Sequence, residues 1–540
     1  MYDLEFDLNM AILKTKNYKE FTVIDKETGL VLKTFSGAKH AGKCLPGDSV
    51  NVTENGCTLV SRCVQPTIAG LLELNSKVKF GYSGRNVPIY MFVPFNESYP
   101  PFVVGCSEKD TSVNRLALIR FDGLWDDGFP RGLLQRLLPI GAETEALFWT
   151  YSPLACEKYK GVLPPVADLT GRQELGPGTF HIDPIGCKDV DDVLTFSGDD
   201  CVIITIADVA ATILEGSDLD LRASKICQTF YQDGVQPKHM FPAELSEMQM
   251  SLLSGDRPGL SLRVNLSTLA CDWFESVVRV EKTFSYESVY QELELCLKLK
   301  RMSSAFGLDS DDSHKWIEAA MKFYNIQAAK LLKEKGYGVL RSHKAPDVTK
   351  LESYTSVDPS LAFLAYNAAS YVSGPYDGDV NHWGLGENAY THATSPIRRY
   401  ADLINQRALK AILKGLTCES RIDVTCMNMV GKASKQHDRD YIYLTAIKKS
   451  LTGSVMGKLI SVREVEEGIV KLSFFVPEWQ LIVKTKYNKG IEPDTVISKD
   501  ETVCLKTVVG ANYCLSYHAD LRARSWKRRI ILRLEARVEA

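Results

Sequence analysis

Short apolar runs, separated by glycine, asparagine and proline, make up the chain to about residue 150. Residues 20–24 and 89–93 are two such runs. Runs of this length between turn residues are typical of β-strands. They predict two small β-barrels in tandem, over residues 1–77 and 78–158, and a single irregular β domain is the alternative.

The periodicity changes after about residue 160. Within residues 288–305, 315–335 and 399–414, apolar residues recur at spacings of three and four, which predicts long helices. An apolar strand at residues 202–206 follows an Asp-rich loop. This mixture predicts one large α+β domain over residues 159–450.

Short strands return near the end of the chain, for example at residues 468–475, and predict a third small barrel over residues 451–540. The expected fold class is therefore multidomain, with a central α+β domain flanked by small β-barrels. The segment from Arg522 to Arg537 is locally basic. Most basic runs are solvated faces, and Trp526 within this one raises the chance of a nucleic-acid contact.

The composition is that of a folded protein. Apolar residues make up 45% and charged residues 24% of the 540 residues, which excludes a mainly disordered chain, a collagen and a coiled-coil rod. Lys and Arg number 64 against 67 Asp and Glu, so a uniformly basic nucleic-acid coat is excluded. A local basic channel is not excluded, because an electrostatic field depends on where the charges lie.

Few features of the sequence bear on the cellular compartment of the protein. The 14 cysteines are scattered without a C-x-x-C pair, and no apolar run reaches the length of a membrane-spanning helix. The first ten residues are acidic and lack the pattern of a signal peptide. We therefore expect no membrane association and a reduced, cytoplasmic compartment, or an organelle if a transit peptide has been removed. We also expect a monomer.

Four aspartates crowd into residues 183–192, namely Asp183, Asp189, Asp191 and Asp192. Like charges this close repel each other, so a folded domain keeps them ionised only with compensation. A divalent cation is the simplest compensation, and carboxylate oxygens suit Mg²⁺ or Mn²⁺. Gly186 lets the loop turn back so that the first aspartate can rejoin the others. The loop is therefore a candidate site for one or two metals.

A solvent-facing acidic turn and a structural calcium loop are the two alternatives for this segment. Phe180, Ile182, Val190 and Val193 flank the aspartates and predict that the loop is anchored in a core, which weighs against a solvent-facing turn. The spacing of an EF-hand is absent, which weighs against a calcium loop. The spacing favours a catalytic metal site by about two to one.

Two adjacent arginines, Arg398 and Arg399, follow Ser395 and Pro396. Ser followed by Pro is typical of an N-cap and a first turn, so we predict that a helix begins at Pro396. Cations in the first turn oppose the helix dipole by roughly 0.3–1 kcal/mol each, and a phosphate bound at the helix start would offset this. Pairing of Arg398 with Asp402 is the alternative, and it accounts for only one of the two arginines.

Three motifs together resemble the RNB family, the RNase II and RNase R type of 3′→5′ exoribonucleases. They are I-D-P-x-x-x-x-D-x-D-D at 182–192, I-A-D-V-x-x-x-x-x-E-G-S-x-L-D at 206–220 and Y-x-H-x-T-S-P-I-R-R-Y-A-D-L at 390–403. They stand in the family's order and at similar separations. The resemblance implies that the two N-terminal barrels are of the cold-shock type and that the C-terminal barrel is of the OB type.

The resemblance also implies roles for the charged residues. The four aspartates fall on the acidic positions that hold Mg²⁺ and activate water. We assign the tighter metal to Asp183 and Asp192, and the second metal and the water to Asp189 and Asp191. Arg398 falls on the arginine that contacts the phosphate beside the scissile bond.

Further residues fall on RNA-contacting positions of the family. Tyr286 is similar to the tyrosine that holds the 3′-terminal nucleotide, and Tyr231 to an aromatic that stacks on bases nearer the channel entrance. Glu318 matches a glutamate of the base pocket. Asp438 stands where the family often has a backbone-contacting glutamate. Phe306 is our candidate for a second stacking aromatic.

The function implied is hydrolysis of single-stranded RNA from its 3′ end to 5′-nucleoside monophosphates, with Mg²⁺ or Mn²⁺ as cofactor. Two metals about 3.5–4 Å apart can stabilise the attacking and leaving oxygens of such a reaction. The alternatives are an inactive RNA-binding protein on the same scaffold and a metal-stabilised scaffold for a degradation complex. The complete set of four aspartates favours the enzyme.

Overall fold

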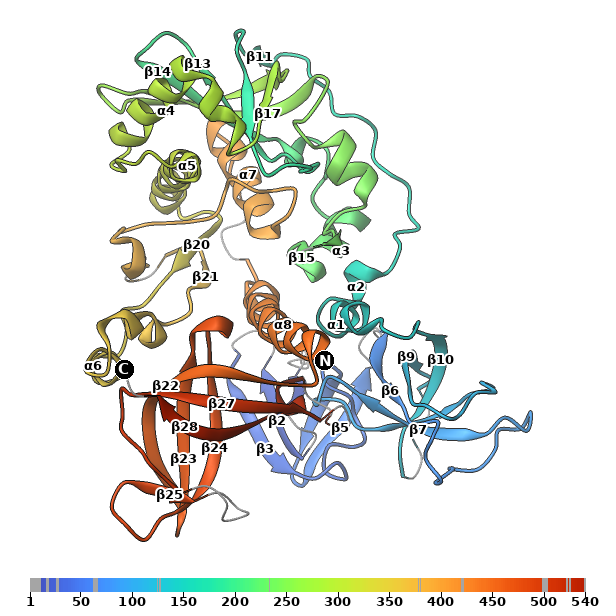
Figure 1. The fold of residues 1–540 in the computed structure, drawn as a ribbon. Helices are drawn as coiled ribbons and strands as arrows, with labels where there is room; N and C mark the ends of the chain where they lie inside the picture. The colour runs from blue at the N-terminus through green and yellow to red at the C-terminus, as the bar shows by residue number, and fades with distance from the viewer. Residues whose placement is uncertain are drawn as a thin grey trace, which may run out of the picture. The chain divides into compact units, whose positions relative to one another are not determined.

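The structure, a computed structural model, divides into two compact units (Figure 1). Residues 1–156 and 435–540 form the first unit, and residues 157–434 form the second, which we call the central unit. The structure describes residues 11–15, 19–25, 29–61, 67–123, 125, 128–232, 234–376, 378, 380–418, 422–497, 504–520, 523 and 526–538. Within these ranges, no helix is long and apolar enough to cross a membrane.

The first unit contains a five-stranded antiparallel sheet near the N-terminus. Strand β1 pairs with both β2 and β4, and the strand order is β3-β2-β1-β4-β5. Leu13, Phe21 and Val23 are buried, as expected for strands with one face on a core. The strands are β1 (Ala11–Thr15), β2 (Glu20–Asp25), β3 (Val31–Ser36), β4 (Ser49–Thr53) and β5 (Gly56–Ser61).

A closed five-stranded barrel follows in the chain, and antiparallel pairing of β9 with β10 closes it. Gly70 in β6 has no room for a side chain, because a Cβ there would lie 2.3 Å from the carbonyl oxygen of Val93. Strand β6 begins at Ile68, so the barrel includes residues before position 77, where we placed the boundary. The elements are β6 (Ile68–Leu72), β7 (Ile89–Pro94), β8 (Phe102–Gly105), β9 (Arg115–Phe121), β10 (Arg131–Leu137), α1 (Glu143–Tyr151) and α2 (Pro153–Cys156).

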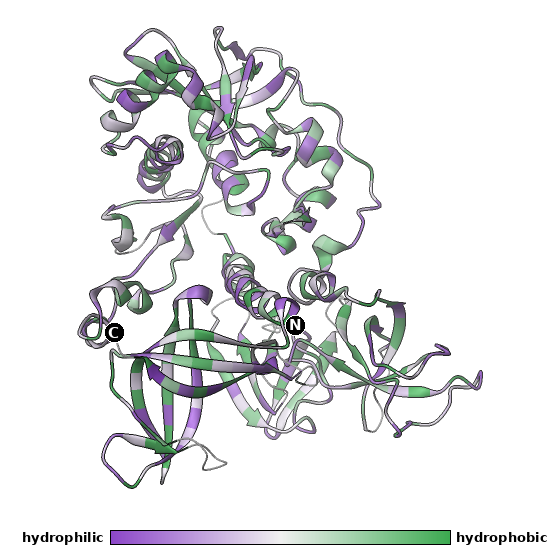
Figure 2. Cartoon of the chain, viewed as in Figure 1, coloured by the Kyte–Doolittle hydropathy of each residue, from purple (hydrophilic) through white to green (hydrophobic). Residues whose placement is uncertain are grey.

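The C-terminal part of the first unit is a seven-stranded antiparallel sheet of order β26-β25-β24-β23-β22-β27-β28. Hydrophilic and hydrophobic residues alternate along its strands (Figure 2), which is the pattern of strands with one face on a core. Leu472, Phe474 and Tyr513 lie on the buried face. The elements are β22 (Thr452–Glu466), β23 (Ile469–Val476), η6 (Pro477–Trp479), β24 (Leu481–Lys489), β25 (Thr495–Ile497), β26 (Cys504–Lys506), β27 (Asn512–Ala519), η7 (Trp526–Arg529) and β28 (Ile530–Val538).

The central unit is built on a mixed seven-stranded sheet of order β11-β18-β17-β14-β13-β12-β19. At its edge, β12 pairs in parallel with β19, with Ile182 opposite Phe284. On its other side, β12 pairs antiparallel with β13. The strands are β11 (Gln173–Glu174), β12 (Phe180–Ile182), β13 (Asp192–Phe196), β14 (Cys201–Ala207), β17 (Arg257–Asn265), β18 (Cys271–Val278) and β19 (Lys282–Phe284).

Long helices complete the core of the central unit. Buried residues of the sheet cluster with Leu299 of α4, Trp316 and Phe323 of α5 and Leu409 of α7. Helix α5 has Asp312 as its N-cap, and it ends at Gly336, whose φ of 73° suits a left-handed C-cap. The helices are η3 (Ser288–Gln291), α4 (Leu293–Ala305), α5 (Ser313–Lys335) and α7 (Tyr400–Leu413). Helix α8 (Thr425–Lys449) begins in the central unit and ends in the first unit.

Shorter elements connect these parts. They are η1 (Val209–Ala211), α3 (Asp218–Ile226), β15 (Phe230–Gln232), β16 (Val235–Lys238), η2 (Glu244–Gln249), β20 (Val339–Ser342), α6 (Val348–Thr355), η4 (Pro359–Ala365), β21 (Ser370–Ser373) and η5 (Trp383–Leu385). The prediction of a multidomain chain, with a central α+β domain between β-rich regions, is confirmed.

The prediction that a helix begins at Pro396 is wrong, because α7 begins at Tyr400. Arg399 is extended, with φ −137° and ψ 126°, and it forms an antiparallel bridge with Gln228. The N–H of Tyr400 and the carbonyl of Arg398 pair with residues 227–229, and this pairing outweighs the local preference of Ser-Pro for a helix start.

Candidate active site

The acidic loop joins two paired strands of the central sheet. Asp183 directly follows β12 and Asp192 is the first residue of β13. Between them, the N–H of Cys187 donates to the carbonyl of Pro184 (3.0 Å), and Gly186 takes a φ of 86°. This positive φ allows the chain to turn back, as predicted. The sheet therefore holds both ends of the loop.

One cavity of about 420 Å³ collects five of the residues to which we assigned roles, namely Asp183, Asp192, Tyr286, Glu318 and Arg398. They come from separate segments of the central unit, the acidic loop, the turn after β19, helix α5 and the turn before α7. Tyr390, His392 and Asn325 line the same cavity. The cavity is therefore our candidate active site.

Asp191 holds Arg398, one of the two arginines that line this cavity. One carboxylate oxygen accepts from the N–H of Ile397 (2.9 Å), and the other accepts from Nε of Arg398 (3.1 Å). Asp191 is only 4% exposed, and burial raises the pKa of its carboxyl to about 7 although Arg398 opposes the shift. Burial alone would lower the pKa of Arg398, but Asp191 and its other anionic neighbours raise it. The pair positions the guanidinium at the cavity.

Asp192 differs from its neighbour because its carboxylate accepts no hydrogen bond within the described part of the chain. Burial raises its pKa well above the usual range, and the charges of Asp183 and Asp191 raise it further. A half-buried carboxylate without a donor and beside other carboxylates is a costly arrangement for the ionised form. A cation at this point would offset that cost.

Asp189 contacts Tyr231, the aromatic that we expect to stack on bases nearer the channel entrance. The hydroxyl of Tyr231, in β15, donates to its carboxylate. Burial and the charge of Asp189 raise the pKa of that hydroxyl. Tyr231 nevertheless remains 43% exposed. Its ring is thus available to a ligand, while its hydroxyl is hydrogen-bonded to Asp189 of the acidic loop.

Asp183 is oriented by a histidine that we had not selected from the sequence. Nδ1 of His181 donates to the carboxylate (2.9 Å), and Nε2 lies 3.1 Å from the hydroxyl of Thr283 in β19. His181 is 3% exposed. Its position two residues before Asp183 in a strand was the available signal, since residues i and i+2 share a face.

Tyr286 lies against a second aromatic ring. Its ring centroid is 3.9 Å from that of His314, with 10° between the planes. Burial raises the pKa of Tyr286 to about 12, and Asp183 contributes to the shift. Glu318, one turn further along α5 from His314, accepts from Lys315 (2.6 Å). The stacked pair forms an aromatic wall of the cavity.

The turn before α7 is fixed by a buried aspartate. The carboxylate of Asp402 accepts from the backbone N–H of Ser395 (2.8 Å) and from Nη2 of Arg399 (2.8 Å). The two arginines are thus paired separately, Arg399 with Asp402 and Arg398 with Asp191. The alternative pairing of Arg398 with Asp402 is therefore wrong.

Two further residues organise the third motif. The Asn325 amide of α5 accepts from the N–H of Ala393 (2.7 Å). His392 has Nδ1 2.7 Å from the hydroxyl of Tyr371, and burial lowers its pKa well below the usual range. His392 belongs to the motif that carries the resemblance, but we had assigned it no role.

Asp438 and Phe306, two predicted RNA contacts, are not among the residues that line this cavity. Asp438 belongs to the first unit, on α8, where its carboxylate lies 3.2 Å from Nδ1 of His437. Phe306 caps α4 and stacks on Phe323, with 4.1 Å between ring centroids. In the basic C-terminal run, Arg522 and Arg524 lie outside the described residues, and the side chain of Trp526 is not described either.

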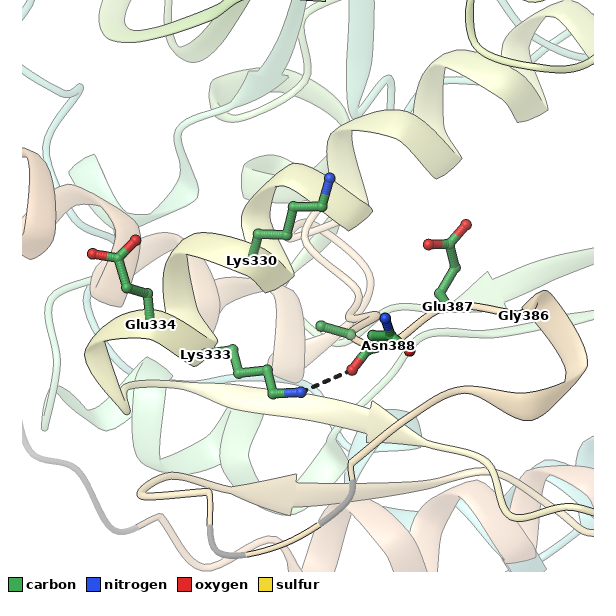
Figure 3. A pocket seen from close by; sticks show the side chains of 7 residues that line it. Lys330, Lys333, Glu334, Gly386, Glu387 and Asn388 are labelled. Carbon is green, nitrogen blue, oxygen red and sulfur yellow. Dashed lines mark hydrogen bonds between the residues drawn. The ribbon is translucent and has the colours of Figure 1, made fainter.

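A second cavity in the central unit, of about 540 Å³, is lined by α5 and the segment after η5 (Figure 3). Two lysines, Lys330 and Lys333, line it, and Lys333 donates to the carbonyl of Asn388 (2.9 Å). Glu334 and Glu387 balance their charge. It shares no lining residue with the cavity of the aspartates.

The residues present suit a magnesium-like cation. In the ranges that the structure describes, three or more His, Cys, Asp or Glu side chains do not converge on one point. Mg²⁺, however, is commonly held by one or two carboxylates, with water and substrate phosphates filling the other positions. Asp183 and Asp192, which line the same cavity, provide such a pair.

Comparison with known proteins agrees with this geometry. Residues 172–305 and 292–415 match the model of the RNB domain family. This match to the RNB domain family lies within the central unit and confirms the resemblance seen in the motifs.

Characterised relatives are ribonucleases. The chain is 26% identical over 478 residues to Ribonuclease R of Helicobacter pylori, which covers 72% of both chains. It is 26% identical over 368 residues to Exoribonuclease 2 of Klebsiella pneumoniae, which covers 51% of this chain and 56% of that protein. The chain thus aligns with little more than half of the length of Exoribonuclease 2.

Solved structures share the fold. RNase R of Mycoplasma genitalium, in complex with ribose-methylated single-stranded RNA, superposes with a TM-score of 0.69 at 16% identity, over 97% of this chain and all of that one. Yeast Ssd1, a pseudonuclease, superposes with a TM-score of 0.61 at 16% identity, over 92% of this chain and 80% of that one. The fold alone is therefore compatible with either an active or an inactive protein.

Proposed function

We propose that the protein is a 3′→5′ exoribonuclease that hydrolyses single-stranded RNA to 5′-nucleoside monophosphates with the help of Mg²⁺ or a similar cation. The observation that carries this proposal is the 420 Å³ cavity, whose lining brings together Asp183 and Asp192, Arg398, and a stacked aromatic pair. Relatives that are ribonucleases support the choice of RNA as substrate.

The carboxylates are proposed to hold the cation. Asp183 and Asp192 line the cavity, and His181 fixes the orientation of Asp183. Asp189 and Asp191 complete the acidic set, and they accept hydrogen bonds from Tyr231 and Arg398 respectively. A bound divalent cation supplies positive charge to the phosphoryl oxygens and lowers the pKa of a bound water.

Arg398 is proposed to stabilise the negative charge that develops on the phosphate. Its Nε is held by Asp191, which leaves the two terminal nitrogens of the guanidinium for the non-bridging oxygens. Donors fixed in advance stabilise a transition state because they need no reorganisation as the charge develops. Asp191 is thus a positioning residue for Arg398.

The aromatic wall is proposed to hold the last nucleotide. His314 covers one face of Tyr286, so the pair can present a single flat surface to a base. Stacking of a base on an aromatic side chain contributes roughly 1–3 kcal/mol and tolerates any base. Discrimination against DNA requires a contact with the 2′-hydroxyl.

The test uses 5′-labelled oligo(A), Mg²⁺ and the whole chain. We expect progressive shortening and release of 5′-AMP by the wild type, and a loss of at least about a thousandfold in rate for Asp192→Asn with RNA binding retained. Asp256→Asn is the matched control, because this exposed aspartate pairs with Arg279 outside the cavity. Equal rates for both variants would contradict the proposal.

A second candidate is an RNA-binding protein without turnover. It is favoured by the hydrogen bonds that occupy Asp189 and both oxygens of Asp191. It predicts that the wild type binds oligo(A) but leaves it intact at every Mg²⁺ and Mn²⁺ concentration. The same gel assay, with a parallel binding measurement, therefore separates the two candidates.

A further inference from the structure

Two cysteines that are far apart in sequence meet in the central unit. The Sγ atoms of Cys227 and Cys426 are 3.6 Å apart across a separation of 199 residues. Cys227 is the C-cap of α3, and Cys426 is the second residue of α8. A disulfide has an S–S distance of about 2.05 Å, so a bond between them requires an approach of about 1.5 Å.

The two thiols differ in exposure and in hydrogen bonding. Cys227 is 5% exposed and lies against Cys426 and the carbonyl of Ser224, whereas Cys426 is only partly buried. The hydrogen bond between the thiols raises the pKa of Cys227 and lowers that of Cys426, although burial opposes the second shift. Cys426 is thus the more accessible thiol and the better nucleophile.

The pair adjoins the segment that carries Arg398. The carbonyl of Cys227 accepts from the N–H of Tyr400 (2.8 Å), and the N–H of Thr229 donates to the carbonyl of Arg398 (2.9 Å). Gln228 bridges to Arg399 between them. Cys227 is therefore the first residue of a short backbone ladder that holds the turn before α7.

We propose that Cys227 and Cys426 form a site of reversible oxidation by peroxides, and that the resulting disulfide ties the ladder at residues 227–229 to the start of α8. The thiolate of Cys426 attacks one oxygen of hydrogen peroxide, the O–O bond breaks, and a sulfenic acid and a hydroxide form. The hydroxide takes up the proton that the Cys426 thiol released and becomes one water. Cys227 then attacks the sulfenic sulfur, the S–O bond breaks, and a disulfide and a second water form. Two electrons pass from the thiols to the peroxide, and an external dithiol reverses the change.

The chemical test is oxidation of the whole chain with about one equivalent of hydrogen peroxide, followed by alkylation and mass spectrometry of peptides. We expect one cross-linked peptide pair that contains Cys227 and Cys426, a loss of two hydrogen masses, and full reversal by dithiothreitol. Cys426→Ser must abolish the cross-link. The matched control is Cys271→Ser, which removes an exposed thiol of β18 and must leave the cross-link intact.

The structural test is amide hydrogen exchange before and after oxidation. The disulfide restrains Cys227, so the amides of Thr229 and Tyr400 should exchange about tenfold more slowly in the oxidised wild type. In Cys426→Ser, peroxide should not change the exchange of these two amides. This control does not depend on Cys227→Ser, a variant that can fail to fold because Cys227 is buried. A cross-link elsewhere, over-oxidation of Cys426 without a cross-link, or unchanged exchange at both amides would each overturn the proposal. None of these measurements depends on nuclease activity.

Discussion

Asp191 and Asp192 are adjacent in sequence, yet their side chains have different surroundings. Asp191 accepts two hydrogen bonds from the turn at residues 397–398, whereas Asp192 accepts none within the described residues. Burial raises the pKa of both carboxyls. Arg398 already compensates the negative charge of Asp191. A bound cation therefore stabilises the ionised form of Asp192 more than that of Asp191.

Replacement of Arg398 by lysine tests the value of the guanidinium. Lysine keeps the positive charge but cannot contact Asp191 and a phosphate at once with a planar fork. We expect kcat/KM on oligo(A) to fall by about 10²–10³. Arg279→Lys, at an exposed pair with Asp256, is the matched control and should leave kcat/KM unchanged. A loss of less than fivefold in Arg398→Lys would exclude the proposed contact with the phosphate.

His382 should make the stability of the central unit depend on pH. Burial lowers its pKa to about 4, and the nearby His343 contributes. Because the folded state disfavours the protonated ring, the stabilisation is complete above the unfolded pKa of about 6.5 and is lost as the pH falls towards 4. We expect the difference in unfolding free energy between wild type and His382→Gln to shrink over this range. Urea unfolding at pH 7.5, 5.5 and 4.5 measures it, and a constant difference would contradict the assignment.

Single residues divide clearly into those that sequence could identify and those that it could not. The acidic loop was recognisable because four like charges within ten residues require a partner. His181 and His314 were not recognisable, since their roles depend on rings and carboxylates that approach only after folding. Tertiary contacts of this kind leave no local pattern.

At the scale of elements, the turn before α7 shows tertiary pairing outweighing a local signal. Ser395-Pro396 has the chemistry of a helix start, but the backbone of Arg399 pairs with Gln228 and α7 begins only at Tyr400. The apolar spacing over residues 315–335 and 399–414 predicted α5 and α7 to within two residues at each end, because this spacing reflects burial against the sheet, whereas the Ser-Pro signal placed the start of α7 too early. Pairing partners, by contrast, are not encoded in the neighbouring residues.

Asp402 is the residue on which this turn depends. Its carboxylate is fully buried and accepts from Ser395 and Arg399. Asp402→Ala removes both acceptors, so we expect the unfolding free energy of the central unit to fall by about 2–4 kcal/mol. Asp402→Asn keeps an acceptor oxygen and should cost less. Urea unfolding measures both, and an equal cost for the two variants would show that the hydrogen bonds are not the reason.

At the scale of the whole molecule, the sequence indicated a central α+β domain and β-rich regions, and the structure groups the N-terminal and C-terminal regions into one unit. Sequence patterns report which segments form strands, but they do not report which distant regions associate. The closed barrel illustrates this, because its first strand, β6, precedes the boundary that we drew from the grouping of short apolar runs.

Binding of a cation should stabilise the central unit as a whole. With a dissociation constant near 1 mM, 10 mM Mg²⁺ would add about 1.4 kcal/mol, which corresponds to a rise in Tm of roughly 2–3 °C for a unit of this size. The affected transition should be the one that Asp402→Ala lowers. Differential scanning calorimetry with and without Mg²⁺ measures the shift. An equal shift in Asp192→Asn would place the cation elsewhere.

The parallel pairing of β12 with β19 joins two three-residue strands whose members are about a hundred positions apart in the chain. Asp183 follows one strand and Tyr286 lies two residues beyond the other. A slip of one residue would shift the tyrosine by about 3.3 Å and reverse its face. On the proposed function, the pairing of these two short strands sets the distance between Tyr286, which holds the terminal base, and Asp183, which holds the cation at the bond to be cleaved.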